Sequence, residues 1–180
     1  MTNNQNLKEK ASKIKLMAFD IDGVFTDGSL IFGDDGKEYK CFDAKDGQGI
    51  ICVEHAGIIV TIITARESGT VWFRAKNLGI KELHQGIKFK LPVLEEVMKK
   101  YNLTYENVSY MGDDLPDICI LRKVGLACCP NDAVEEVRKE CDFISSKNGG
   151  KGAIRELCDF VLNSQNINPL DIVEQAHSKC

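Results

Sequence analysis

The feature that most constrains the fold is a series of short apolar runs separated by longer amphipathic stretches. Residues 14–19, 57–63, 108–111 and 125–128 form such runs, and residues 142–145 form a shorter fifth one. The runs are apolar throughout and do not alternate with polar residues. They therefore predict the strands of a sheet that is covered on both faces.

The stretches between these runs have the spacing of amphipathic helices. Pro92 and Pro116 lie near the start of two of them, in the first turn, where a helix tolerates proline. Strands that alternate with helices in this way predict an α/β fold with a doubly wound, Rossmann-like parallel sheet. The predicted helices cover residues 46–56, 68–78, 91–101, 115–123, 133–141 and 152–162.

One segment interrupts the alternation directly after the first strand. Residues 29–32 and 37–42 are expected to pair as a β-hairpin around the turn sequence Gly33-Asp34-Asp35-Gly36. This insertion is too short to form a cap domain. We therefore expect residues 1–180 to form a single domain, with residues 1–12 as a polar N-terminal tail and residues 164–180 as a C-terminal tail or helix.

Charge and hydropathy exclude several classes of partner. The net charge is −4 and no block of like charges occurs, which argues against a nucleic-acid-binding protein. No apolar run approaches the roughly 20 residues that span a bilayer, so no membrane partner is expected. The polar start of the chain lacks the apolar segment of a signal peptide, and this predicts a cytoplasmic location.

The eight cysteines are predicted to be reduced and to act mainly as small core residues. None of them forms a C-x-x-C pair, and no histidine stands at zinc-site spacing from them. Cys119, Cys128, Cys141 and Cys158 have apolar neighbours, which favours packing in the core.

Acidic residues, a hydroxyl and cations follow the predicted strands, and these side chains are expected to meet at the carboxyl edge of the sheet, where open parallel sheets bind ligands. The residues are Asp20 and Asp22 after the first strand, Thr64 and Arg66 after the second, Lys90 at the start of a helix, and Asp113 and Asp114 after the third strand.

This combination predicts a magnesium-dependent phosphatase. Carboxylate oxygens suit Mg²⁺, and an aspartate can attack phosphorus to give an aspartyl-phosphate. A metal ion, a lysine and a hydroxyl can neutralise the phosphoryl oxygens in the transition state. Asp114 is equally compatible with a helix N-cap. A receiver-type phospho-acceptor module has similar acids at its strand ends, but Asp22 supplies a base for removing the phosphate and so argues for hydrolysis.

The order of these residues is similar to that of the haloacid dehalogenase superfamily of phosphatases. The run Asp20-Ile21-Asp22-Gly23-Val24 resembles its first motif, and Thr64, Lys90 and Gly112-Asp113-Asp114 resemble the second, third and fourth. Within the superfamily, residues 13–162 most resemble the family of capless 3-deoxy-D-manno-octulosonate 8-phosphate phosphatases. The further matching features are the hairpin and residues 42–49, 63–66, 85–86 and 149–153.

The resemblance implies catalytic roles for four residues. Asp20 would be the nucleophile. Asp22 would be the general acid and base, which first protonates the leaving sugar oxygen and then activates water. Thr64 and Lys90 would bind the phosphoryl group, and Lys90 would also restrain Asp20.

The resemblance also implies the ligands of a magnesium ion. Asp20, the backbone carbonyl of Asp22 and Asp113 would hold Mg²⁺. Asp114 and Asp117 would make supporting contacts.

A phosphorylated sugar acid is the substrate that the resemblance implies. The substrate contacts would come from Asp22, Asp43, Ala44, Lys45, Asp46, Gly47, Arg66, Arg74 and Lys90. Two positions depart from some relatives, because Ile51 and Lys45 stand where those relatives carry arginine. Arg66 favours the eight-carbon acid, whose product enters lipopolysaccharide synthesis, while a nine-carbon sugar acid 9-phosphate remains the alternative substrate.

The resemblance further implies a homotetramer in which the hairpin of one subunit closes the site of its neighbour. The exposed apolar run Leu30-Ile31-Phe32 fits this arrangement, since it would otherwise form a sticky edge.

Overall fold

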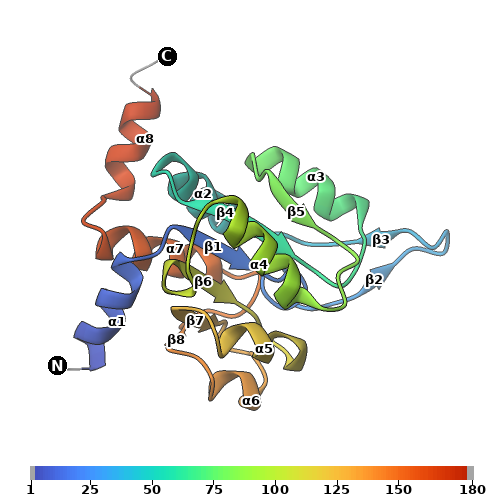
Figure 1. Ribbon diagram of the computed structural model, residues 1–180. Coiled ribbons are helices and arrows are strands. Elements are labelled where there is room, and N and C mark those ends of the chain that lie inside the picture. The colour runs from blue at the N-terminus through green and yellow to red at the C-terminus, as the bar shows by residue number, and fades with distance from the viewer. Residues whose placement is uncertain (1–2, 178–180) are drawn as a thin grey trace.

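The computed structural model describes residues 3–177, and its centre is a six-stranded parallel sheet (Figure 1). The strand order is β5-β4-β1-β6-β7-β8, and every neighbouring pair is parallel. The predicted doubly wound α/β fold is therefore confirmed. The strands are β1 Leu16–Phe19, β4 Ile59–Ile63, β5 Glu82–His84, β6 Val108–Met111, β7 Leu126–Cys129 and β8 Phe143–Ile144.

Helices cover both faces of the sheet, as the continuously apolar strands require. Alternate residues of β1 enter different cores: Met17 and Phe19 face one, and Leu16 and Ala18 face the other. The first core also contains residues of α1 Asn3–Ser12, α2 Ala44–His55, α3 Gly69–Leu78 and α7 Ala153–Ser164. The second contains residues of α4 Lys90–Lys100, α5 Ile118–Leu121 and α6 Glu135–Arg138.

The edge strand β5 has no counterpart in the sequence-based prediction. It pairs with β4 over only three residues, from Thr61 with Glu82 to Ile63 with His84. Polar residues occupy two of its three positions, and His84 is only partly buried. A strand at the margin of a sheet does not need the apolar run that marks a central strand, so its sequence gives little signal.

The prediction of a polar tail over residues 1–12 is wrong for residues 3–12, which form helix α1. Ala11 is fully buried, Leu7 packs against the first core, and α1 contacts α7. Two apolar residues on one face are enough to hold this helix. At the other end of the chain, α8 spans Pro169–His177 and matches the helical alternative.

Two predicted helices are shorter than the pattern indicated. The stretch 115–123 divides into the 3₁₀ turn η2 Leu115–Asp117 and α5, and the stretch 133–141 contracts to α6. Another 3₁₀ turn, η1 Tyr105–Asn107, leads into β6. Cys119 lies on α5 and is exposed, so the core position expected for it is wrong.

Of the other described cysteines, Cys52, Cys128, Cys129 and Cys158 are buried free thiols as predicted, Cys141 is partly buried, and Cys41 is exposed. Cys180 lies outside the described residues. Among the described residues, none of the helices has both the length and the apolar character needed to cross a lipid bilayer.

The predicted hairpin is confirmed as β2 Ile31–Phe32 paired antiparallel with β3 Glu38–Tyr39. It projects from the body of the domain beyond the carboxyl ends of the strands, beside α3 (Figure 1). Its apolar side chains Leu30, Ile31, Phe32 and Tyr39 are exposed.

Candidate active site

The loop after β1 places Asp20 at the centre of the carboxyl edge of the sheet. β1 lies between β4 and β6, and the Asp20 amide donates to the Met111 carbonyl at 3.1 Å. The amides of Val24, Phe25 and Thr26 all donate to the Ile21 carbonyl, which closes a tight turn just beyond Asp20. The position of Asp20 is therefore fixed by the backbone on both sides.

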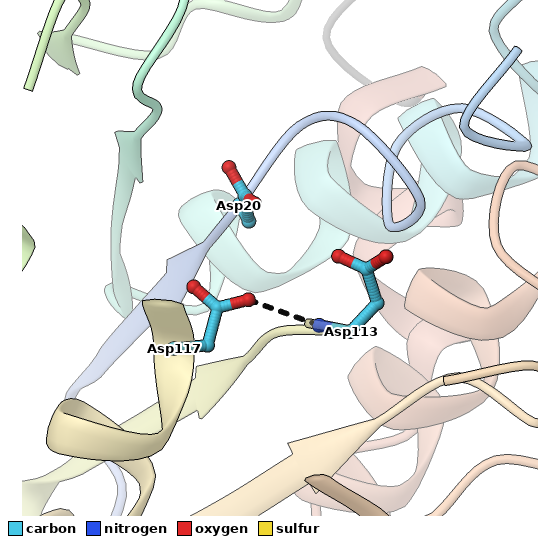
Figure 2. Close-up of side chains that lie close together, drawn as sticks. All are labelled: Asp20, Asp113 and Asp117. Atoms are coloured by element: carbon cyan, nitrogen blue, oxygen red, sulfur yellow. Dashed lines mark hydrogen bonds between the residues drawn. The ribbon is translucent and has the colours of Figure 1, made fainter. Parts of the chain in front are cut away.

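Three carboxylates converge at this edge (Figure 2). Asp20 follows β1, Asp113 follows β6, and Asp117 ends the turn η2. One oxygen atom from each side chain lies within 4.8 Å of the other two. This carboxylate cluster, Asp20–Asp113–Asp117, contains two of the predicted magnesium ligands.

Lys90 supplies the cation of the cluster from the first residue of α4. Its ammonium nitrogen lies 2.8 Å from Asp20 Oδ2 and 2.7 Å from Asp117 Oδ1. The side chain is almost completely buried. The structure thus brings Lys90 into contact with Asp20, which is the contact that the sequence analysis expected.

Asp117 supports the cluster through four hydrogen bonds. Its Oδ1 accepts from Lys90 and from the Tyr110 hydroxyl at 2.6 Å, and its Oδ2 accepts from the amides of Asp113 at 3.0 Å and Asp114 at 3.4 Å. Both oxygens already have protein donors, so Asp117 orients Lys90 and the Asp113 backbone. Tyr110 was missed in the sequence, because a tyrosine inside an apolar strand gives no signal of this role.

Burial and mutual repulsion shift the pKa values of the cluster. Burial raises the pKa of Asp20 to about 6 although Lys90 opposes the shift, and the Asp117 charge adds to it. Burial, followed by the charges of Asp117 and Asp20, raises the pKa of Asp113 to about 8. Burial lowers the pKa of Lys90, but Asp20 and Asp117 outweigh that effect and the net shift is upward. The carboxylates thus carry more negative charge than Lys90 balances.

The donor set fits a magnesium ion. The Asp113 carboxylate forms no hydrogen bond or ion pair with any described residue, and it packs against Gly23, where a Cβ atom would overlap it. Gly23 has φ +83°, so this position needs glycine for its conformation as well as for space. Asp20 and Asp113 thus present hard oxygen ligands and excess negative charge, which is what Mg²⁺ requires.

Asp22 does not belong to the carboxylate cluster. Its Oδ1 pairs with the Lys40 ammonium, and its Oδ2 lies 3.7 Å from Arg66 Nε. Arg66 also binds Glu38 at 2.9 Å. Arg66 was predicted at the site, but Lys40 and Glu38 on the hairpin were missed, because nothing in a short polar strand marks a residue that reaches another loop.

Thr64 lies at the end of β4 with its side chain buried. Its amide donates to His84 and its carbonyl accepts from Ile87, both at 3.0 Å, so the backbone fixes the residue at the carboxyl edge. Its contact with a phosphoryl group stays a prediction.

The predicted substrate segment 43–47 has a clear structural role at two of its positions. Asp43 caps α2 by accepting from the amides of Lys45 and Asp46. The buried Asp46 carboxylate accepts from the α7 amides of Gly152 at 3.2 Å and Arg155 at 2.8 Å. Its side chain is therefore committed to α7, whereas Ala44 and Lys45 are exposed and free to meet a ligand.

Arg74 is held against the same segment. It donates to the Asp43 carbonyl at 3.0 Å, and a Cβ atom on Gly47 would overlap its guanidinium group. Its Nε is buried without a hydrogen-bond partner. Arg74 thus positions the start of α2, and its substrate contact stays a prediction.

The glycine-rich loop before α7 packs on the loop after β1 of the same chain. The Gly150 amide donates to the Val24 carbonyl at 2.9 Å. A Cβ atom on Gly149 would overlap the Gly23 carbonyl. Only glycine permits this approach, which braces the loop that carries Asp22.

A parallel sheet whose central strand ends in this carboxylate–lysine cluster is characteristic of haloacid dehalogenase-like hydrolases, a class that includes magnesium-dependent phosphatases. A family model described as haloacid dehalogenase-like hydrolase matches residues 88–157, which include Lys90, Asp113 and Asp117.

Relatives across almost the whole chain define the family more narrowly. The 3-deoxy-D-manno-octulosonate 8-phosphate phosphatase KdsC of Escherichia coli K12 is 40% identical over 87% of this chain and 83% of its own. The crystal structure of the Yersinia pestis phosphatase has a TM-score of 0.88 at 37% identity, covering 89% of this chain and 87% of that one. The Moraxella catarrhalis phosphatase, in complex with magnesium ion, phosphate ion and a KDO molecule, has a TM-score of 0.91 at 38% identity, covering 97% and 99%. The chain belongs to the 3-deoxy-D-manno-octulosonate 8-phosphate phosphatase family.

Proposed function

We propose that this chain hydrolyses 3-deoxy-D-manno-octulosonate 8-phosphate to the free sugar acid and phosphate, in lipopolysaccharide precursor synthesis. The observation that carries the proposal is the carboxylate cluster with Lys90, found in a chain that is 40% identical to phosphatases of this name. The reaction needs a nucleophile, a cation site and a phosphoryl-binding lysine, and all three lie together.

Asp20 attacks phosphorus, and its new bond to phosphorus forms as the bond to the sugar oxygen breaks. The Lys90 ammonium, 2.8 Å from Asp20, aligns the nucleophile and neutralises charge on the phosphoryl oxygens. Thr64 offers its hydroxyl from the neighbouring strand. Asp20, Asp113 and the backbone carbonyl of Asp22 would hold Mg²⁺, which would neutralise charge on the transferring group when bound.

Asp22 acts as the general acid and base of the reaction. It protonates the leaving sugar oxygen in the first half of the reaction. In the second half it removes a proton from water, whose oxygen attacks phosphorus and releases Asp20. The Asp22 carboxylate lies outside the carboxylate cluster, which supports this assignment because a side chain that does not ligate the metal ion can exchange protons with substrate and water.

The eight-carbon acid is the favoured substrate because relatives 40% identical to this chain are named for it. Arg66 stands beside Asp22, where its guanidinium group can pair with a sugar carboxylate. Ala44 and Lys45 are exposed, and Arg74 contacts Gly47 and the Asp43 carbonyl, so this segment can supply the remaining substrate contacts. The positions of Ile51 and Lys45 make the nine-carbon 9-phosphate the second candidate substrate.

A panel of phosphorylated sugar acids tests the substrate. We expect kcat/KM for the eight-carbon 8-phosphate to exceed that for the nine-carbon 9-phosphates by at least about tenfold, which corresponds to ~1.4 kcal/mol of transition-state binding. A reversed preference would replace the substrate and keep the reaction. An absence of magnesium-dependent turnover on any phosphate ester, including an aryl phosphate, would favour a receiver-type module.

The proposed assembly is a homotetramer, and the exposed apolar hairpin supports self-association of the chain. Leu30, Ile31 and Phe32 lie exposed on the hairpin, and Trp72 and Phe73 lie exposed on α3, which stands beside it (Figure 1). A second copy of the chain can cover this apolar surface. Light scattering should give four times the chain mass, and a fully active monomer would contradict the proposal.

A further inference from the structure

Lys40 is an unusual lysine for an exposed hairpin. Its side chain is only 1% exposed, whereas that of Lys37, three residues earlier on the same hairpin, is 74% exposed. An ammonium group loses hydration when it is buried, so it must be held by anions. A burial this complete outside the hydrophobic core indicates a specific task.

The anions that hold Lys40 are Asp22 and Glu38. Lys40 pairs with Asp22 Oδ1 and lies 3.3 Å from Glu38 Oε1. Arg66 closes the arrangement, because it lies 3.7 Å from Asp22 Oδ2 and 2.9 Å from Glu38 Oε1. These four side chains form a charge ring, Asp22–Lys40–Glu38–Arg66, with two carboxylates and two cations. The ring joins the hairpin to the loops after β1 and β4.

The charge ring determines which way Asp22 faces. Both of its oxygens meet cations of the ring, and neither belongs to the carboxylate cluster at the metal site. Asp22 is nevertheless only two residues from Asp20 along the chain. Without the ring, its carboxylate would be attracted to a Mg²⁺ ion bound at Asp20, because Mg²⁺ favours carboxylate ligands.

We propose that Lys40 is a positioning residue that holds the Asp22 carboxylate away from the metal site and on the side of the leaving oxygen. The inference rests on the proposed function, since it assigns Lys40 to the general acid and base of that reaction. Lys40 acts through Asp22 and needs no contact with the phosphoryl group.

A double-mutant cycle between Lys40→Met and Asp22→Asn tests the proposal. Rates are measured on the eight-carbon sugar phosphate and, in parallel, on an aryl phosphate. Lys40→Met is expected to lower kcat by about 10- to 100-fold with little change in KM, because the misplaced acid and base slows chemistry more than binding. In the Asp22→Asn background the same substitution should change kcat by less than about threefold. Lys37→Met is the matched control on the hairpin and should leave kcat unchanged.

Magnesium binding provides a readout that does not depend on turnover. In calorimetry, Lys40→Met should bind Mg²⁺ about three- to tenfold more tightly than the parent, because Asp22 becomes available as a ligand. Loss of the lysine charge alone would also tighten binding. The gain must therefore shrink when Asp22→Asn is combined with Lys40→Met.

Each outcome has a defined meaning. Equal effects of Lys40→Met in the Asp22 and Asn backgrounds, or unchanged Mg²⁺ affinity, would overturn the proposal. Light scattering and thermal melting check that the variant keeps its assembly and fold, and Lys40→Gln replaces it in the same cycle if it does not. If the parent cleaves the aryl phosphate and not the sugar phosphate, the proposed substrate fails while the cycle on the aryl phosphate still decides the role of Lys40.

Discussion

Two groups of charged side chains lie side by side at the carboxyl edge of the sheet, and they differ in balance. The carboxylate cluster with Lys90 has three carboxylates and one ammonium group; Lys90 and Asp117 are buried, and Asp20 and Asp113 are partly buried. The charge ring has two carboxylates and two cations, and Arg66 in it is 41% exposed. The carboxylate cluster needs an added cation to balance its charge, whereas the charges of the ring already balance.

The difference in charge balance suits the two groups to different tasks: the cluster can bind a metal ion, and the ring can orient the Asp22 carboxylate. Negative charge that Lys90 does not balance is unfavourable, and it favours the binding of a metal cation to the carboxylate cluster. A balanced ring has little to gain from a metal ion, so it can fix the direction of one carboxylate. Asp20, the proposed nucleophile, lies in one group and Asp22, the proposed acid and base, lies in the other, so the two aspartates have different environments although they are only two residues apart.

The largest effect is expected from Asp20→Asn, which removes the proposed nucleophile while keeping the side-chain size. We expect kcat to fall by at least about 1000-fold, because a neutral amide at this position cannot form the aspartyl-phosphate. Turnover of an aryl phosphate measures it, and Asp34→Asn on the hairpin turn is the control. Ordinary activity in Asp20→Asn would rule out the covalent mechanism.

Removal of Mg²⁺ from the carboxylate cluster is expected to lower kcat almost as strongly. The side-chain contacts of the charge ring should stay unchanged. Treatment with a chelator should abolish turnover, and Mg²⁺ should restore it, since the phosphoryl oxygens lose their main counter-charge. Activity that persists in excess chelator would show that Lys90 alone suffices.

The stability of the metal-free protein should depend on pH through the cluster. The folded pKa values of Asp20, about 6, and Asp113, about 8, lie above the ordinary value of 3.8, so the native state binds these protons more tightly than the unfolded chain. The free energy of unfolding should therefore fall as pH rises from 3.8 toward about 8.

Urea unfolding at pH 6 and pH 8 measures this slope. Saturating Mg²⁺ should flatten it, because the ion favours the ionised carboxylates, and Asp113→Asn should reduce it in the metal-free protein. A slope that is identical in Asp113→Asn and the parent would mean that other groups cause it.

Gly23→Ala should weaken the cluster through a steric effect. Gly23 and Gly36 have similar positive φ angles, but only at Gly23 would the new Cβ overlap the Asp113 carboxylate. Both substitutions should cost about 1 kcal/mol of stability for backbone strain. Only Gly23→Ala should also lower Mg²⁺ affinity, measured by calorimetry. Equal Mg²⁺ affinity in the two variants would show that Asp113 moves aside freely.

The smallest effect is expected from Asp46→Asn, because Asp46 lies outside both groups. The asparagine side chain keeps one oxygen acceptor for the backbone N–H groups of Gly152 and Arg155 and loses the second. The free energy of unfolding should therefore fall by about 1 kcal/mol, while kcat changes by less than about twofold. Thermal melting and turnover measure the two quantities, with Asp34→Asn again as the control. A large rise in KM would instead support the substrate contact that the sequence predicted for Asp46.

Much of the fold was predictable because the central strands are buried on both faces. Their continuous apolar runs identified β1, β4, β6 and β7, and the strand-end acids located the site. The edge strand β5 was not predictable, since its polar residues read as a loop. Helix α1 was missed because the segment is mostly polar and only Leu7 and Ala11 of it belong to the first core.

The candidate site was predictable in its residue types and less so in its contacts. Asp20, Lys90 and Asp113 were expected together, and the structure brings them together. The support from Tyr110 and the fourfold bonding of Asp117 were not predictable, nor was the commitment of Asp46 to α7. These roles depend on which segments pack together, and residue spacing along the chain does not encode that.

The sequence by itself determined the parallel sheet, the hairpin and the order of acids, hydroxyl and lysine along the carboxyl edge. Periodicity and strand ends are local properties, so a linear pattern can carry them. Only the tertiary structure decided that Asp20 and Asp22 lie in differently balanced groups. Lys90 contacts Asp20 from α4, and Lys40 contacts Asp22 from the hairpin. Both contacts join segments that are far apart in the sequence, so they form only when the chain folds.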